Sequence, residues 1–321
     1  MVGSLNSRKP LLSSLLMVAA LILFCGQPSH SETLFEGYYR VFRSGQHVGF
    51  FIMRHRFEPV EGKKKKFKFT STTFMKTVGE DGEDTESIKA VCDENLVPLS
   101  YSYTALSGKK TRTIDATFAD GKYTAHIKNN GQDEKIQKPL PTGVFLSQFL
   151  LHYILRTKQG LKPNLRVSYR ALAEEFGEVK DGVATTKDYE VQEGLRVLRV
   201  ENTFLGQNSI NFVSEKGEII STHMTETKMA LELTASPSTA TADFKVPSPV
   251  LAGLFGEVPT GQKNILSQIK HEEVQVPKPI IPEGATKQQG VPAGKGIQLK
   301  AKIPRDEPPN PPASDSAKDP Q

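Results

Sequence analysis

The sequence predicts a mainly β fold: a curved antiparallel meander, or half-open barrel, with one buried helix in its concave face. Three observations lead to this prediction. Short segments of alternating apolar residues are separated by turn residues through most of the chain. These segments follow one another without helices between them, which is typical of an antiparallel meander. One segment, Thr142 to Arg156, instead has apolar residues around nearly its whole circumference, as a buried helix does.

The sequence predicts that the N-terminal residues are a cleaved signal peptide. Leu11 to Phe24 is an apolar run of signal-peptide length that follows a short basic region. Ser29 and Ser31 stand where small residues precede a cleavage site. We therefore expect residues 1–31 to be a signal peptide and the mature chain to be periplasmic or secreted in a bacterium.

Cys25 offers an alternative to simple cleavage. It lies in "LILFCG", which resembles a lipobox, except that Phe24 stands where a small residue is normally required. Acylation of Cys25 would give a lipid-anchored form, and simple cleavage is the favoured reading. Cleavage would leave Cys92 as the sole cysteine, so the exported chain would have no internal disulfide.

The β domain is expected to span residues 32–236, and it opens with a hairpin that is apolar on both faces. The stretch "YYRVFRSGQHVGFF" has its turn at Ser44 to Gln46. A hairpin with one face in water alternates apolar and polar residues, so this one needs a cover on each face. The two sets of apolar side chains are Val48, Phe50 and Ile52 on one face, and Phe51, Met53 and Phe57 on the other.

Two further hairpins have clear turn signals. "TIDATFADGKYTAHI" alternates on both sides of Asp120-Gly121, and "INFVSEKGEIISTHM" does so around Lys216-Gly217. Asp-Gly between alternating strands is the strongest local hairpin signal.

The buried helix is predicted over residues 142–156, with Thr142 as its N-cap and Gly160 beyond its end. We expect it to cover the second face of the opening hairpin, with Phe145 and Phe149 near Phe50 or Phe51. A site between helix and sheet would be lined by aromatic side chains. The candidate ligand-binding residues are Phe50, Phe51, Phe145, Phe149 and Tyr153.

The chain changes character after the β domain. Residues 237–270 are expected to be an extended Pro/Ser-rich segment with a short apolar knot at Val250, Leu251, Leu254 and Phe255. Residues 271–321 are Pro/Lys-rich and carry few large apolar side chains, which predicts a disordered tail.

The sequence predicts no enzyme and no cofactor. It contains no phosphate-binding loop, nucleophile elbow or paired catalytic carboxylates. The sequence also gives no signal for a metal site, since it contains neither a Cys pair nor a His pair at helical ligand spacing. The net charge of +5 is mild, and export argues against a nucleic-acid partner. No stretch after the leader predicts a transmembrane span.

The opening "YYRVFRSGQHVGFF", the meander and helix that follow, and the closing "GEIISTHMTETKMALELTA" resemble a known group of domains. These are the uncharacterised bacterial periplasmic β domains related in fold to the LolA/LolB lipoprotein carriers. Similar domains precede transglutaminase-like modules, whose catalytic residues this chain lacks. The resemblance covers about Phe35 to Ala235. It implies a half-open sheet, curved around a helix, that in relatives accommodates acyl chains.

Two functions follow as hypotheses. The first is a non-enzymatic periplasmic binding module for a lipid, an acyl chain or an apolar segment. The alternative is an envelope scaffold or protein-interaction protein, with a core filled by its own helix and a Pro-rich tail that binds. The expected partner is thus a lipid or an envelope protein, and the sequence sets no oligomeric state.

Overall fold

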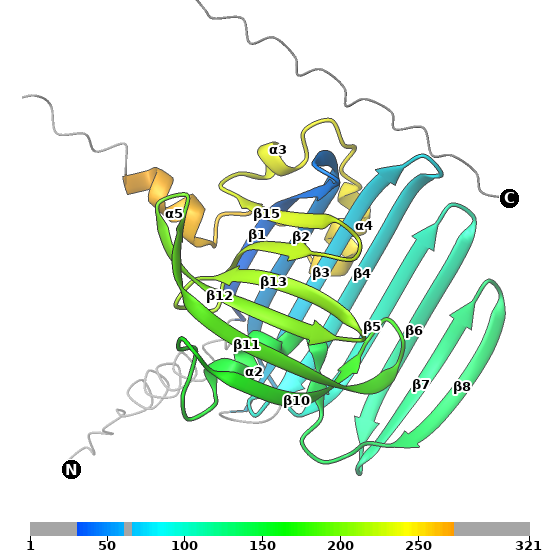
Figure 1. Ribbon diagram of the computed structural model, residues 1–321. Helices are drawn as coiled ribbons and strands as arrows, with labels where there is room; N and C mark the ends of the chain where they lie inside the picture. The colour runs from blue at the N-terminus through cyan, green and yellow to red at the C-terminus, as the bar shows by residue number, and fades with distance from the viewer. Residues whose placement is uncertain (1–30, 61–65, 273–321) are drawn as a thin grey trace, which may run out of the picture. The chain divides into compact units, whose positions relative to one another are not determined.

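One twisted sheet of 15 strands makes up most of the computed structural model, which describes residues 31–60 and 66–272 (Figure 1). The predicted signal peptide, Cys25 and the predicted tail lie outside the described residues, apart from Ser31 and the end of α5. The strands are β1 (Glu32–Arg43), β2 (Gln46–Pro59), β3 (Phe67–Gly79), β4 (Gly82–Asp93), β5 (Pro98–Ser107), β6 (Lys110–Ala119), β7 (Lys122–Asn129), β8 (Gln132–Pro139), β9 (Phe145–Leu146), β10 (Arg166–Ala173), β11 (Glu178–Gln192), β12 (Leu195–Phe204), β13 (Gln207–Val213), β14 (Ile219–Met224) and β15 (Met229–Thr234). The helices are η1 (Ser147–Phe149), α2 (Leu150–Leu155), α3 (Pro237–Ala240), α4 (Ser248–Phe255) and α5 (Ile265–Glu272).

The strand order confirms the predicted meander. β1 to β8 are neighbours in chain order, β15 pairs with the other side of β1, and β14 to β10 follow in reverse order. Every pairing between the described strands is antiparallel except the short parallel pairing of β9 with β10. β8 and β9 are the two ends of this sheet, which is therefore not closed into a barrel.

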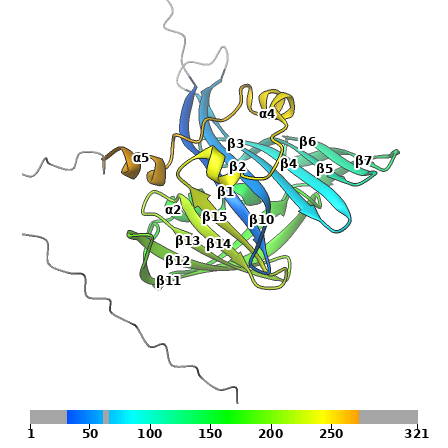
Figure 2. The same cartoon turned by 90° about the horizontal axis from the view of Figure 1, so that it is seen from above.

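The sheet folds over on itself into two layers. β10 to β15 lie across one face of the β1–β8 layer, and α2 lies between the layers (Figures 1 and 2). The largest apolar cluster fills this space on the side of α2, where Phe149, Ile154, Ile114 and Leu198 are all buried. The predicted buried helix in the concave face is thus present.

The hairpin turns have the backbone that their residues predict. Ser44 and Gly45 have φ of 50° and 81°, and Asp120 and Gly121 have φ of 52° and 68°. Two successive positive φ values are the mark of the type I′ turn, which matches the twist of its flanking strands. The structure confirms both turns.

The predicted helix boundaries need correction. Helical structure begins at Ser147 and ends at Leu155, so Thr142 is not the N-cap. Phe145 and Leu146 are instead extended, because they pair with Ala171 and Leu172 of β10. Strand pairing at the sheet end has replaced the first helical turn.

The segment after β15 was expected to be extended, and this prediction is wrong. The segment forms α3, α4 and α5. α4 contains the apolar knot, with Leu251 and Phe255 buried against the outer face of the opening hairpin. Figure 2 shows α4 on the opposite side of β2 and β3 from β13 and β14. The apolar side chains beneath this C-terminal segment are Tyr38, Phe50, Ile52 and Phe74.

A buried ion pair holds the C-terminal segment in place. The guanidinium of Arg54 lies 2.5 Å from the Glu36 carboxylate, and it also donates to the backbone carbonyl of Phe255. The second oxygen of Glu36 accepts hydrogen bonds from the backbone N–H groups of Thr260 and Gly261. The outer cover of the hairpin is therefore fixed by polar contacts as well as by apolar packing.

Candidate ligand-binding cavity

A cavity of about 590 Å³ lies between the two layers of the sheet, beside α2. Its lining residues come from β1–β4 on one layer, from η1 and α2, and from β12–β15 and the β13–β14 turn on the other. Ligand pockets in proteins are commonly ~300–1,000 Å³, so this volume suits a small molecule or a lipid chain.

The cavity exists because α2 fills only one part of the concave face. Phe149 packs on Phe69 with ring centroids 5.0 Å apart, and both side chains are buried. Leu150 and Leu151, at the start of α2, line the cavity instead. A helix of 6 residues is too short to occupy the whole face, so the part next to β1, β14 and β15 stays open.

The alternation of β2 decides which side chains line the cavity. Phe51, Met53 and His55 point between the layers, while Phe50 and Arg54 point under the C-terminal segment. The principal apolar side chains of the wall are Phe35, Tyr39, Phe51, Met53, Met75 and Leu231.

Methionine is prominent in this wall. Met53, Met75 and Met224 line the cavity, and the whole chain contains only 6 methionines. Methionine side chains are flexible and polarisable, so they adapt to apolar ligands of irregular shape.

Two histidines meet at the cavity wall. His55 of β2 and His152 of α2 have ring centroids 4.8 Å apart in an edge-to-face arrangement. Both rings also contact Phe69. Nε2 of His55 and Nδ1 of His152 are enclosed and have no hydrogen-bond partner within the described part of the chain. Leaving a buried polar group unpaired costs about 1–3 kcal/mol, so this pair requires an explanation.

Their surroundings keep these histidines neutral. Burial lowers the pKa of His55 well below its ordinary value, and the neighbouring His152 lowers it further. Burial lowers the pKa of His152 to about 4, and the positive charge of Arg156 adds to this effect. Both imidazoles are therefore uncharged at neutral pH.

Two carboxyl groups with raised pKa values lie at or near the cavity. Glu86 lines the cavity, and burial together with Glu175 raises its pKa to about 7. Glu174 is fully buried, and burial raises its pKa to about 7. One of its oxygens accepts a 2.6 Å hydrogen bond from the Ser147 hydroxyl, and the other accepts from the Gln148 N–H. Glu174 thereby anchors the start of η1 beside the cavity.

The structure separates the five predicted site residues. Phe51 lines the cavity as expected. Phe50 faces the other way and lies 6.0 Å from Phe74 and 6.5 Å from Phe244. Phe145 stacks on Tyr153 at 4.4 Å and also contacts Tyr169, in the packed core rather than at the cavity. Phe149 is packed on Phe69. Phe145 and Phe149 were expected near Phe50 or Phe51. Their aromatic partners within the described residues are instead Tyr153, Tyr169 and Phe69, while Phe50 lies on the opposite face of β2.

The sequence reasoning missed the methionines and the two histidines. The sequence pattern could have placed Met53 and His55 in the site, because residues 51, 53 and 55 of one strand point to the same face. No sequence signal links His55 to His152, because their contact depends on how α2 docks in the sheet.

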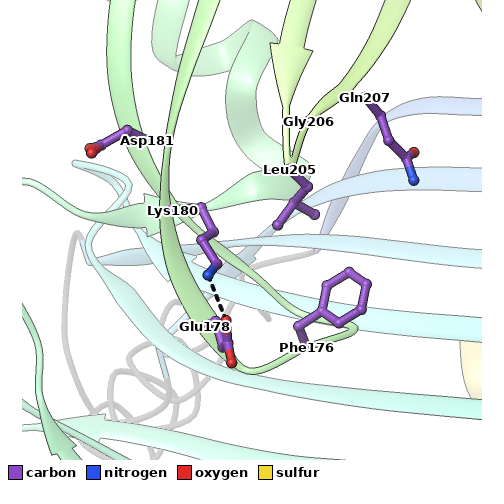
Figure 3. Close-up of a pocket in the computed structure, with 7 residues that line it drawn as sticks. All are labelled: Phe176, Glu178, Lys180, Asp181, Leu205, Gly206 and Gln207. Atoms are coloured by element: carbon purple, nitrogen blue, oxygen red, sulfur yellow. Dashed lines mark ion pairs between the residues drawn. The ribbon is translucent and has the colours of Figure 1, made fainter.

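A second hollow, of about 470 Å³, lies at the tips of two hairpins (Figure 3). The β10–β11 connection contributes Phe176, which is 52% exposed, and the β12–β13 turn contributes Leu205. Lys180 and Glu178 form an exposed ion pair here at 2.8 Å. This hollow is shallow and polar, so it is a weaker candidate than the interior cavity.

A family model described as "Protein of unknown function (DUF3108)" matches residues 35–197, about half of the chain. The chain belongs to the DUF3108 family. The matched region of this DUF3108 chain contains β2, α2 and both cavity histidines. The second layer from β13 onward and the C-terminal segment lie beyond it.

A solved structure is also similar to this DUF3108 chain. It is described as a "Beta-barrel-like Protein of Domain of Unknown Function DUF1849" from Brucella abortus. The two share 11% sequence identity with a TM-score of 0.42, over 63% of this chain and 97% of the other. None of the curated proteins matches the sequence. Within the described residues, every helix is too short or too polar to cross a membrane.

Proposed function

We propose that this DUF3108 chain is a non-enzymatic binding protein of the bacterial envelope, and that its interior cavity holds one acyl chain or a similar apolar segment. The observation that carries the proposal is the cavity of about 590 Å³ between the sheet layers, which the chain's own helix leaves open. Each methylene group that leaves water for such a site contributes about 0.8 kcal/mol.

Three features support this role. The wall is largely apolar and rich in methionine, as adaptable lipid sites are. The sequence resembles periplasmic β domains that are related in fold to the LolA/LolB carriers, and this resemblance implies a concave face that accommodates acyl chains. The leader-like residues 1–31 favour a periplasmic or secreted location.

Cysteine catalysis is disfavoured because the one described cysteine is a poor nucleophile. Cys92 is buried, and burial raises the pKa of its thiol to about 12. The thiolate that a cysteine enzyme needs is therefore disfavoured.

The alternative of a scaffold with a self-filled core fits only the part of the concave face that α2 occupies. The filled part contains Phe149 and Ile154, and the open part contains Phe51 and Met53. The Pro-rich tail that would bind in this alternative lies outside the described residues.

The absence of tryptophan from the sequence provides a clean test. Phe51→Trp places a single indole in the cavity wall, and Phe244→Trp places one in the C-terminal segment, against the opposite face of the hairpin. We expect a fatty acyl chain with a bromine near its end to quench the emission of the first variant in a saturable way. The second variant is the control and should stay bright. Quenching of neither variant, or of the second alone, would refute an acyl site in this cavity.

A further inference from the structure

The His55–His152 pair is the part of the cavity that an apolar chain alone does not explain. Phe35 and Phe69 lie against the His55 ring at 5.8 and 5.7 Å, and Phe69 lies 4.6 Å from the His152 ring. Two imidazoles in so apolar a place, each with an enclosed unpaired nitrogen, form a polar spot in the wall. Both histidines line the cavity, and a half-turn of an imidazole about its Cβ–Cγ bond exchanges the positions of its nitrogen and carbon atoms.

The charges that line the cavity do not favour an anionic ligand. Apart from the two histidines and the phenol of Tyr39, the ionisable side chains in the lining are Glu86, Lys216 and Glu218. Lys216 is the single cation of this set, and it is exposed on a turn that also carries Glu218. Neither cavity histidine forms an ion pair with a carboxylate of the described residues. A carboxylate or phosphate placed beside the histidines would lose its water, and the exposed Lys216 is the one cation of the lining that could offset this loss.

A neutral imidazole has one N–H donor and one acceptor nitrogen, so two adjacent rings present both kinds of partner. An ester carbonyl needs a donor, and a hydroxyl needs a donor or an acceptor. Both groups can be buried here without a charge.

We propose that the cavity selects amphiphiles whose polar group is uncharged, such as acylglycerol esters, and that His55 and His152 hydrogen-bond to that group. This inference rests on the proposed function, since it names the ligand class of the same cavity. His55 and His152 then act as specificity-determining residues.

The test compares two ligands with the same hydrocarbon chain, monolaurin and laurate, as competitors of the brominated acyl chain in the Phe51→Trp protein at neutral pH. We expect monolaurin to compete at least about tenfold more strongly than laurate, the equivalent of one or two hydrogen bonds. If neither ligand competes and the brominated chain does not quench, the proposed function itself fails. If laurate competes as well as monolaurin or better, the cavity binds chains but the inference about the polar group is wrong.

Variants assign the selectivity to the histidines. His55→Phe and His152→Phe, each added to Phe51→Trp, should bring the monolaurin-to-laurate ratio close to one. His55→Gln keeps a donor and an acceptor and should retain most of the preference. His223→Phe changes an exposed histidine of β14 and is the matched control. An unchanged ratio in His55→Phe and in His152→Phe would overturn the assignment to this pair.

Discussion

The guanidinium of Arg54 on β2 and the carboxylate of Glu36 on β1 form a buried ion pair at 2.5 Å. This pair lies beneath the C-terminal segment. Arg54 also donates to the Phe255 carbonyl, while Glu36 accepts from Thr260 and Gly261. The pair thus joins β1 and β2 to a segment more than 200 residues further along the chain. The outer face of the hairpin is closed by this segment, and the inner face is left to α2 and the cavity.

Arg54→Met should destabilise the fold by about 3–5 kcal/mol, because it leaves the Glu36 carboxylate buried without its cation. Urea unfolding measures this change. Arg40→Met is the matched control, because Arg40 pairs with Glu232 at 2.8 Å with both side chains more than a third exposed. That variant should lose about 0–1 kcal/mol. Equal losses in the two variants would mean that the Arg54 pair is not buried in solution.

Removal of the C-terminal segment should uncover the outer face of the hairpin. A chain that ends at Ser236 loses Leu251 and Phe255, each worth about 1.5–3 kcal/mol of burial, and leaves Arg54 and Glu36 without their backbone partners. We expect a large fall in the melting temperature. A chain that ends at Glu272 keeps α3 to α5 and should melt close to the full chain. A chain ending at Ser236 that is as stable as the full chain would show that the segment does not dock.

Phe149 and Phe51 should respond differently to truncation. Phe149 is fully buried against Phe69, so Phe149→Ala should cost about 3–5 kcal/mol of stability. Phe51 is half-buried and lines the cavity, so Phe51→Ala should cost less stability and should weaken the binding of a fluorescent acyl probe. Chemical denaturation and probe titration on both variants make the comparison. A larger stability loss in Phe51→Ala than in Phe149→Ala would contradict the assignment of core and cavity.

Glu174 should make the fold less stable as the pH rises. Its folded-state pKa of about 7 lies above the ordinary 4.5, so the folded chain binds the extra proton and stability falls between these two pH values. The cavity histidines change stability with pH in the opposite direction. Because their pKa values are lowered in the folded state, stability is lost as the pH falls below 6.5. The two effects partly offset each other in the wild-type chain.

The Glu174→Gln variant separates the pH dependence of stability due to Glu174 from that due to the cavity histidines. The amide can still accept from the Gln148 N–H and meet the Ser147 hydroxyl, but it does not titrate. The stability of this variant relative to wild type should rise by about 2–3 kcal/mol from pH 4.5 to above pH 7. Unfolding curves across this range measure it, with Glu178→Gln at an exposed position as the control. A difference that does not vary with pH would refute the raised pKa.

The local parts of the fold could be predicted because local residues determine them. Asp120-Gly121 and Ser44-Gly45 form turns of positive φ, a conformation that these residue types favour locally. The alternation on both faces of β2 correctly required two covers. The alternation could not show which cover lies on which face. Phe50 and Phe51 are both phenylalanines, and the pattern says only that they point to opposite faces.

The rest depends on long-range pairing. β15 joins β1, with Thr234 opposite Tyr38, and no local signal specifies that contact. Phe145 and Leu146 have a helical pattern, yet they pair with Ala171 and Leu172 of β10. The cavity arises from the distance between the two layers, and that distance is set by packing across the whole sheet.

The central claim is that the cavity between the layers holds a lipid-like ligand, and native mass spectrometry of the exported chain, purified without detergent, tests it most directly. We predict a species heavier than the bare chain by the mass of one amphiphile. Met224→Trp, which fills part of the cavity, should lose this species. His223→Trp changes the preceding residue of β14, on the opposite face, and should keep this species. A mass equal to the bare chain for the wild type, or an adduct that survives in Met224→Trp, would contradict the claim.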